Sequence, residues 1–322
     1  MSNRFARFAS AIAALSIVVA GCGGAASGPD PYELADSSAK VGWDPLQVNI
    51  GFAYKDGATS ITLEPSAIAM VLDTAGQKGA VHMSLPASAM GVPKEALRQL
   101  GIHGDSLDMD MIFDGKTLYG RSPLFAQMLA MLLGPSGDLP TGDLSDWLQF
   151  GTTEDWAALE GLAGGSGGSG AAPSLPVATG GDAESTKSAF ETAGITLTVA
   201  AEEKRNGADA NHVKVAIDGT KLLASPYFNA AGTRAQLAQM EAAFKQFTMS
   251  GDLWLDKASK KLIELDVHLA GTKNEGQTAD ITVTFHDPDG SVSLTAPPSA
   301  LDVPVEALIK KLMQLAGRGA DS

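Results

Sequence analysis

Cysteine and long apolar runs are both nearly absent from this chain of 322 residues. The one cysteine is Cys22, which excludes intrachain disulfides, zinc–thiolate centres and any second thiol nucleophile. The longest apolar run, residues 8–20, is shorter than the roughly 20 residues that a bilayer-spanning helix needs. The sequence also has no Gly-rich phosphate-binding motif between a strand and a helix, and no short-period repeat.

Basic residues are outnumbered by acidic ones. Lys and Arg number 23 against 37 Asp and Glu, which gives a net charge of −14. An acidic chain repels nucleic acid and anionic headgroups at long range, so we expect no nucleic-acid partner. Hydrophobic residues make up 44% of the chain, which is enough to build a packed core.

The N-terminus has the pattern of an export signal. Arg4 and Arg7 precede the apolar run, and Val19-Ala20-Gly21-Cys22 places two small residues before the cysteine. This order is typical of a cleaved signal peptide, and its end is the lipobox of bacterial lipoproteins. We predict a signal peptide at 1–21, a diacylglycerol on the Cys22 sulfur, and anchoring to the outer face of the cytoplasmic membrane. The alternative is a short N-terminal helix with a buried cysteine.

Composition divides the remainder of the chain. Residues 22–31 are rich in Gly, Ala, Ser and Pro and predict a flexible tether, and residues 32–316 are expected to form a single domain. Gly, Ser, Ala and Pro also dominate residues 164–181, which cannot bury enough apolar surface to become ordered. We interpret 164–181 as a flexible loop rather than a domain boundary, because the strands on both sides share one pattern and need partners for their edges.

Apolar residues recur at every second position through most of the domain. In residues 263–269 they alternate with Glu264, Asp266 and His268, which is typical of strands with one wet face. About a dozen such strands, joined by turns such as Asp114-Gly115, and four to six helices favour an antiparallel α+β fold over a parallel one. The pattern also predicts a last strand around residues 292–294, a sheet that ends at Pro297-Pro298, and a helix at 303–316.

The residues that could carry catalysis do not form a recognisable site. Ser166 lies in a G-x-S-x-G sequence, but its surroundings are a Gly/Ser linker rather than the strand and helix of a nucleophile elbow. His82, His212 and His268 fall on the polar positions of strands, which predicts solvent exposure, and no two histidines have metal-ligand spacing. Asp108, Asp110 and Asp114 are interpreted as a wet strand face with its turn. We therefore predict no enzyme and no metal.

The eleven methionines are the unusual apolar feature. Methionine is flexible and polarizable and adapts to irregular apolar partners. Core packing explains any single methionine, but together they predict a cavity lined by Met, Leu, Ile and Phe. We expect its wall at Ile50, Phe52, Met83, Met109 and Met111. The lid would be Leu129 and Leu132 of an apolar helix at 124–133. An error of one residue in strand register would turn these side chains to the other face.

Several segments occur in an order known from one family. A hairpin runs from Ser250-Gly251-Asp252-Leu253-Trp254-Leu255-Asp256 through a turn to residues 261–267, and residues 281–285 and 292–298 follow it. Residues 113–119 and then Asp146-Trp147 match the first half. With the lipobox, this set resembles the LprG/LppX-type lipoproteins of mycobacteria, in the LolA-like superfamily, over most of residues 32–298. The chain departs from them at 65–105, at 164–181 and after Pro298.

The resemblance implies a curved antiparallel half-barrel with helices over its concave face and an apolar cavity beneath them. It implies a carrier of acyl chains from a lipid or lipoglycan, which passes between a membrane transporter and the outer layer of the envelope. Such a carrier needs no cofactor beyond its own covalent diacylglycerol. The alternative is a surface-anchored structural or sensory module with a solid core that binds a protein. A hydrolase that uses scattered acids is the third hypothesis.

Overall fold

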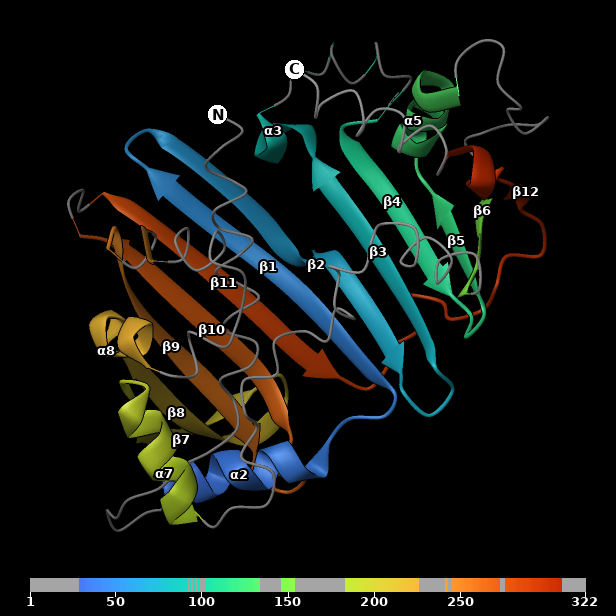
Figure 1. Cartoon of the computed structure of the whole chain (residues 1–322). Helices are drawn as coiled ribbons and strands as arrows, with labels where there is room; N and C mark the ends of the chain where they lie inside the picture. The colour runs from blue at the N-terminus through green and yellow to red at the C-terminus, as the bar shows by residue number, and fades with distance from the viewer. Residues whose placement is uncertain are drawn as a thin grey trace. The chain divides into compact units, whose positions relative to one another are not determined.

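The computed structural model describes residues 29–91, 93, 95, 98, 102, 104–133, 146–153, 183–225, 241–242, 245–272 and 276–308. Twelve strands form an open sheet in the order β12-β6-β5-β4-β3-β2-β1-β11-β10-β9-β8-β7 (Figure 1). With a few helices, this antiparallel-rich sheet confirms the α+β class. Among the described residues, no helix is both long enough and apolar enough to cross a bilayer.

Most strands that are neighbours in the sheet are also consecutive in the chain. The strands are β1 (Leu46–Asp56), β2 (Thr59–Asp73), β3 (Lys78–Pro86), β4 (Ser106–Phe113), β5 (Thr117–Arg121), β6 (Leu148–Thr152), β7 (Ile195–Arg205), β8 (Ala208–Ile217), β9 (Phe247–Asp256), β10 (Leu262–Gly271), β11 (Gln277–His286) and β12 (Leu301–Asp302). The described helices are α2 (Pro31–Val41), α3 (Ala87–Met90), α5 (Pro123–Leu133), α7 (Ala183–Thr192) and α8 (Gly219–Ala224).

The segment after β11 differs from the sequence-based prediction. Residues 292–294 do not form a strand, and the sheet does not end at Pro297-Pro298, because β12 follows and pairs in parallel with β6. The backbone nitrogen of Leu301 donates to the Trp147 carbonyl oxygen at 2.8 Å, which starts this pairing. Val292 and Leu294 alternate because both pack against a hydrophobic cluster on the sheet, so alternation here reports burial rather than strand pairing.

The chain divides into two compact units, and neither is a continuous stretch. Unit 1 contains residues 1–43, 52–62 and 170–285, and unit 2 contains 44–51, 63–169 and 286–322. Strands β1 and β2 contribute residues to both units. The single domain expected at 32–316 stays a prediction. The loop expected at 164–181 lies outside the described residues.

In unit 1, two helices pack on the sheet near β7 (Figure 1). Helix α2 begins where the Asp30 side chain accepts a hydrogen bond from the Tyr32 backbone nitrogen at 2.9 Å, and Gly42 ends it with a φ of 60°. Such a cap satisfies one of the free N–H groups of the first turn. The Tyr32 hydroxyl accepts a hydrogen bond from the Leu197 backbone nitrogen at 3.4 Å, which joins α2 to β7.

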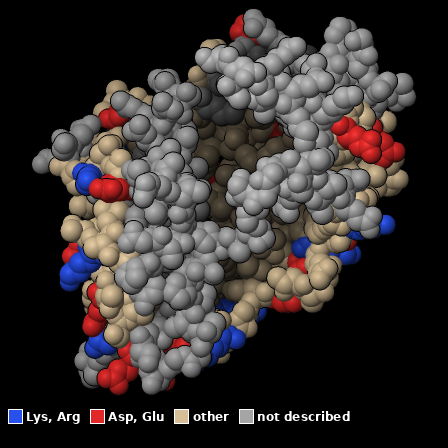
Figure 2. Space-filling view, in the orientation of Figure 1, with Lys and Arg blue, Asp and Glu red and all other residues tan. Residues whose placement is uncertain are grey.

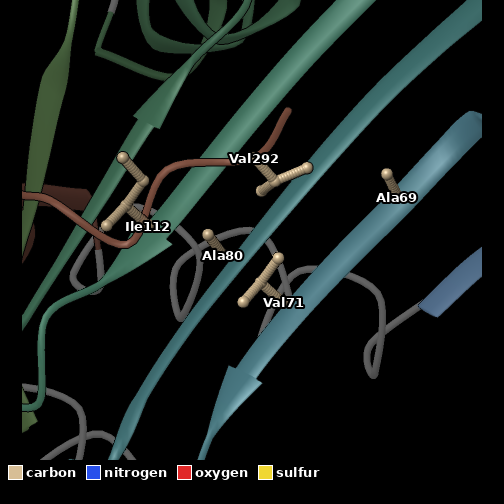
Figure 3. Close-up of a cluster of buried hydrophobic side chains, with 5 residues drawn as sticks. All are labelled: Ala69, Val71, Ala80, Ile112 and Val292. Atoms are coloured by element: carbon tan, nitrogen blue, oxygen red, sulfur yellow. The ribbon is translucent and has the colours of Figure 1, made fainter. Parts of the chain in front are cut away.

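In unit 2, one face of strands β2–β4 carries small, fully packed side chains. We call it the packed face; it comprises Ala69, Val71, Ala80 and Ile112, each no more than 5% exposed. Figure 3 shows Val292, from the segment after β11, beside these side chains. Small side chains let this segment approach the sheet closely, so burial on this face fixes the position of the strands.

Helix α5 packs on the other side of the same sheet. Leu129 is 0% exposed and lies in a cluster with Leu148 and Phe150 of β6. The rings of Phe125 and Phe150 meet edge to face, with centroids 5.1 Å apart. A Cβ atom on Gly120 of β5 would lie 2.8 Å from Phe125 and 2.9 Å from Phe150, so glycine at this position makes room for both rings.

Replacing Gly120 with alanine should therefore weaken the packing of α5 on the sheet. We expect Gly120→Ala to lower the free energy of unfolding by about 1–3 kcal/mol, because the new methyl group overpacks two aromatic rings. The matched control is Gly79→Ala on β3, where the Cβ atom would meet Leu72 at an ordinary 3.5 Å. Urea unfolding of both variants checks this, and equal stability of the two would contradict it.

Candidate functional site

The structure brings three of the predicted wall residues together. Met83 of β3 is the cross-strand partner of Met109 on β4, and Met111 is the partner of Val81. Directly paired residues lie on the same face of a sheet, with Cβ atoms about 4.5–5.5 Å apart. The three methionines therefore form one continuous patch on two neighbouring strands of unit 2.

This patch belongs to a larger apolar surface, which we call the methionine face. Strand register and alternation place ten apolar residues on it: Ile68, Met70, Leu72, Val81, Met83, Leu85, Leu107, Met109, Met111 and Phe113. All are half-buried except Leu72, which is 43% exposed. The described surface over β2–β4 in Figure 2 is predominantly neither acidic nor basic. None of the side chains named on the methionine face is ionisable.

The methionine face and the packed face are opposite sides of the same strands. Val71 and Ala80 are paired across β2 and β3, and they are 1% and 3% exposed. Their sequence neighbours Met70 and Val81 point the other way and are half-buried. The sheet is therefore held from its packed face, and the methionine face keeps apolar surface that the interior does not fully cover.

Helix α5 borders the methionine face. Met111 pairs with Gly120, and the Gly120 Cβ direction points at Phe125 of α5, so helix and methionine face lie on the same side of the sheet. Leu129 of this helix, predicted as a lid residue, is fully buried, and its side chain packs against β6. The side chain of Leu132 lies outside the described residues, as does Cys22.

The other two predicted wall residues lie on β1. Ile50 and Phe52 are two positions apart and both half-buried, so they share one face of their strand. They fall in different compact units, Ile50 in unit 2 and Phe52 in unit 1. Within unit 1, the rings of Phe52 and Tyr54 stack with centroids 6.4 Å apart. We therefore count only Met83, Met109 and Met111 as a joined cluster.

A polar cluster on unit 1 corrects the prediction that His212 faces solvent. His212 Nε2 lies 2.5 Å from Asp252 Oδ1, and its side chain is only 15% exposed. His268 Nε2 lies 3.2 Å from Asp252 Oδ2, and its Nδ1 lies 2.8 Å from Asp280 Oδ1. We call these four residues the His–Asp ladder; they join β8, β9, β10 and β11. The spacing of these four residues in the sequence does not indicate that they lie together.

An aromatic and ionic group lies beside the ladder. The Trp254 ring stacks on His212 with centroids 4.7 Å apart, and Arg205 lies 4.2 Å from the Trp254 ring centroid. Arg205 forms ion pairs with Asp266 and with Glu264, which is 3% exposed. A carboxylate so deeply buried needs its charged partner, so the charged residues predicted as a wet strand face are partly interior.

The pKa values of His268 and Asp266, both on β10, are shifted. Burial lowers the pKa of His268, but its hydrogen bond to Asp280 and the charges of Asp280, Asp252 and Asp266 outweigh burial, so the pKa is raised above 6.5. Burial also raises the pKa of Asp266, only partly offset by a hydrogen bond from Thr282. Both shifts favour the protonated forms.

In unit 2, the predicted acid cluster is divided between two ordinary roles. The Asp110 carboxylate lies 2.7 Å from His82 Nδ1 and accepts a hydrogen bond from Arg121 at 2.7 Å. Burial raises the pKa of Asp110, but these two partners together lower it by more, so the net shift is downward. Asp114 accepts hydrogen bonds from two backbone nitrogens of the β4–β5 turn. Within the described part of the chain, no His, Cys, Asp and Glu side chains are grouped to hold a metal ion. Ser166 lies outside that part.

Comparison with known proteins gives distant structural likenesses. No protein-family model and no curated protein sequence matches the chain. The chain is similar to the lipoprotein LppX of Mycobacterium tuberculosis, at 10% identity and a TM-score of 0.36 over 82% of this chain and 97% of LppX. It is similar to LprF of Mycobacterium bovis, at 10% identity and a TM-score of 0.34 over 83% of this chain and 95% of LprF.

A third likeness is to an outer membrane lipoprotein-sorting protein domain from Vibrio parahaemolyticus. Identity is 11% and the TM-score is 0.22, over 80% of this chain and 92% of that domain. These are lipoproteins of the LppX and LprF kind and a LolA-like sorting domain, the group that the sequence resembles. At such identities and scores they assign neither a ligand nor an activity to this chain.

The His–Asp ladder should make stability depend on pH. Because the His268 pKa is raised in the folded state, its contribution is complete below the unfolded value near 6.5 and is lost as pH rises through the folded value. We expect His268→Gln to destabilise by at most about 1 kcal/mol at pH 5.5, since water screens a half-exposed pair, and by less at pH 9.

Urea unfolding at both pH values measures this difference. Thr198→Gln, at an exposed position of β7, is the control and should show the same small effect at pH 5.5 and pH 9. A His268→Gln effect that is constant, or larger at pH 9, would show that the ladder is not held by a protonated imidazole.

Proposed function

We propose that this chain is an exported, lipid-anchored lipoprotein that binds acyl chains of a lipid or lipoglycan on the methionine face and carries them across the cell envelope. The observation that carries the proposal is the contrast between the two faces of β2–β4. On one face, the cluster of Ala69, Val71, Ala80 and Ile112 is exposed by 5% or less, whereas the apolar side chains of the opposite face are half-buried, apart from exposed Leu72. The sheet is stable without filling the second face, which leaves it available to a ligand.

The chemistry of the methionine face suits an acyl chain. It combines four methionines with branched aliphatic residues, and methionine side chains adjust to irregular apolar partners. Each methylene removed from water contributes about 0.8 kcal/mol, so a chain of about 15 methylenes gains on the order of 12 kcal/mol. A carrier of this kind needs no reactive group, and we therefore propose binding and transfer rather than catalysis.

The same proposal gives the N-terminal residues a role. The lipobox at residues 19–22 would supply a diacylglycerol anchor on Cys22, and two acyl chains are enough for stable attachment. The tether would hold the methionine face close to the membrane that supplies the ligand, and a membrane transporter would be the partner there. Short tethers raise the effective concentration of what they join.

Filling the methionine face should block uptake. We expect Met83→Trp and Met109→Trp to weaken binding of a fluorescent fatty acid about tenfold or more, because the indole occupies the surface that the acyl chain needs, at a loss of at least about 1.4 kcal/mol. Ser84→Trp is the matched control: Ser84 is next to Met83 on β3 and points to the other face.

Fluorescence titration measures the uptake, and circular dichroism with urea unfolding verifies that each variant folds. A second control, Met83→Leu, conserves volume and should bind as the natural chain does. Mass spectrometry of organic extracts from the purified protein is the direct test. The carrier proposal is wrong if no lipid is extracted and no variant differs from the natural chain in uptake.

Removing the anchor sulfur should release the chain. We expect Cys22→Ser to abolish incorporation of labelled palmitate and to move the exported protein from the membrane fraction to the soluble fraction, since no other thiol can carry the lipid. The matched control is Ser27→Ala, a change in the same tether that leaves the sulfur in place. Persistent labelling of Cys22→Ser would contradict an anchor at this position.

A further inference from the structure

Helix α5 exposes apolar side chains on the side that faces away from the sheet. Leu124 is 37% exposed and Met128 is 38% exposed. They are four residues apart, so they lie one turn above the other on one side of the helix. We call this pair the α5 outer row. Its members are two of four large hydrophobic side chains with high exposure in the described part of the chain, the others being Val41 and Leu72.

The α5 outer row is held in place from the opposite side of the helix. Leu129 is fully buried against β6, and Phe125 packs on Phe150. The start of the helix is joined to β4, because the Ser122 hydroxyl donates to the Asp108 carbonyl oxygen at 3.0 Å and accepts from the Leu124 backbone nitrogen at 3.4 Å. The row is therefore a fixed feature rather than a frayed end.

The composition of α5 separates it from the other exposed hydrophobic residues. Residues 123–133 contain no ionisable side chain, and Gln127 is their only polar residue. Val41 follows Lys40, and Leu72 precedes Asp73. Moving an uncharged apolar row out of water costs little, whereas a neighbouring charge would have to lose its hydration. Among the exposed large hydrophobic residues of the described part of the chain, only Leu124 and Met128 have no charged residue next to them in sequence.

The position of α5 connects its outer row to the methionine face. The helix lies on the same side of the sheet, next to Met111, and its first turn is joined to β4 beside Met109. We propose that the α5 outer row inserts into the headgroup–acyl boundary of the membrane to which the chain is tethered, where acyl chains pass between the bilayer and the methionine face. This inference rests on the proposed function.

A bilayer fits this row better than a protein partner does. Cys22 is seven residues before the first described residue, so an anchored chain keeps Pro29 within about 25 Å of the membrane. At that effective concentration, two inserted side chains suffice for contact although they would bind weakly alone. The net charge of −14 disfavours electrostatic attraction to anionic lipid, which leaves apolar insertion as the means of contact.

A thiol probe tests insertion directly. The only natural cysteine is Cys22, which carries the acyl anchor under the proposed function, so Met128→Cys supplies a unique thiol for an environment-sensitive fluorophore. In the full lipidated chain on phosphatidylcholine vesicles, we expect its emission to rise and to be quenched by bromine-labelled acyl chains. Val41→Cys, at the exposed end of α2 in unit 1 and labelled in the same way, is the matched control and should show neither effect. Equal behaviour of the two labelled variants would overturn the inference, and so would a Met128→Cys signal that needs added membrane protein.

A transfer assay separates this inference from the proposed function. We expect the double variant Leu124→Ser, Met128→Ser to slow transfer of a fluorescent short-chain phosphatidylcholine from vesicles about tenfold, the factor for 1.4 kcal/mol. Its equilibrium uptake of the same lipid, supplied as monomers, should be unchanged. Normal vesicle transfer by the double variant overturns the inference and leaves the proposed function standing. If the natural chain takes up no monomeric lipid, the proposed function itself fails.

Discussion

The contact between Val292 and the small side chains of β2–β4 is the constraint from which the features of unit 2 follow. Alanine and valine on the packed face allow the segment after β11 to lie directly on the sheet. Because successive residues of a strand point to opposite sides, the burial on one face sets where every methionine on the other must point. The sheet is thus stabilised on one side and retains apolar surface on the other, where α5 packs over β5 and β6.

In unit 1, the alternation of side chains along each strand separates apolar residues from ion-paired residues. Its buried apolar residues face the helices, and the opposite positions of β8–β11 carry the His–Asp ladder and the Arg205–Glu264 ion pair. Ion pairs at an open surface contribute little, but partly buried ones specify register because each group needs one partner. The polar side of this half is therefore bonded across four strands rather than simply hydrated.

Much of the secondary structure could be predicted from the chain alone. Strict alternation in residues 263–269 and the turn at Asp114-Gly115 correspond to β10 and to the β4–β5 hairpin. The prediction of a strand at residues 292–294 was wrong because packing on a sheet and pairing within it produce the same apolar alternation. His212 was assigned to solvent because the sequence shows its parity on the strand but not the carboxylate of Asp252 that the next strand brings beside it.

The sequence by itself determined the period of the strands, the turns between them, the apolar character of α5 and the α+β class, because each depends on interactions within a few neighbouring residues. Which strands became neighbours without a short turn between them was decided only by the tertiary structure. Pairing placed Met83 beside Met109 and His212 beside Asp252, although these partners are separated by 26 and 40 positions. Such pairs depend on how the whole sheet is ordered, and local propensity carries no information about that order.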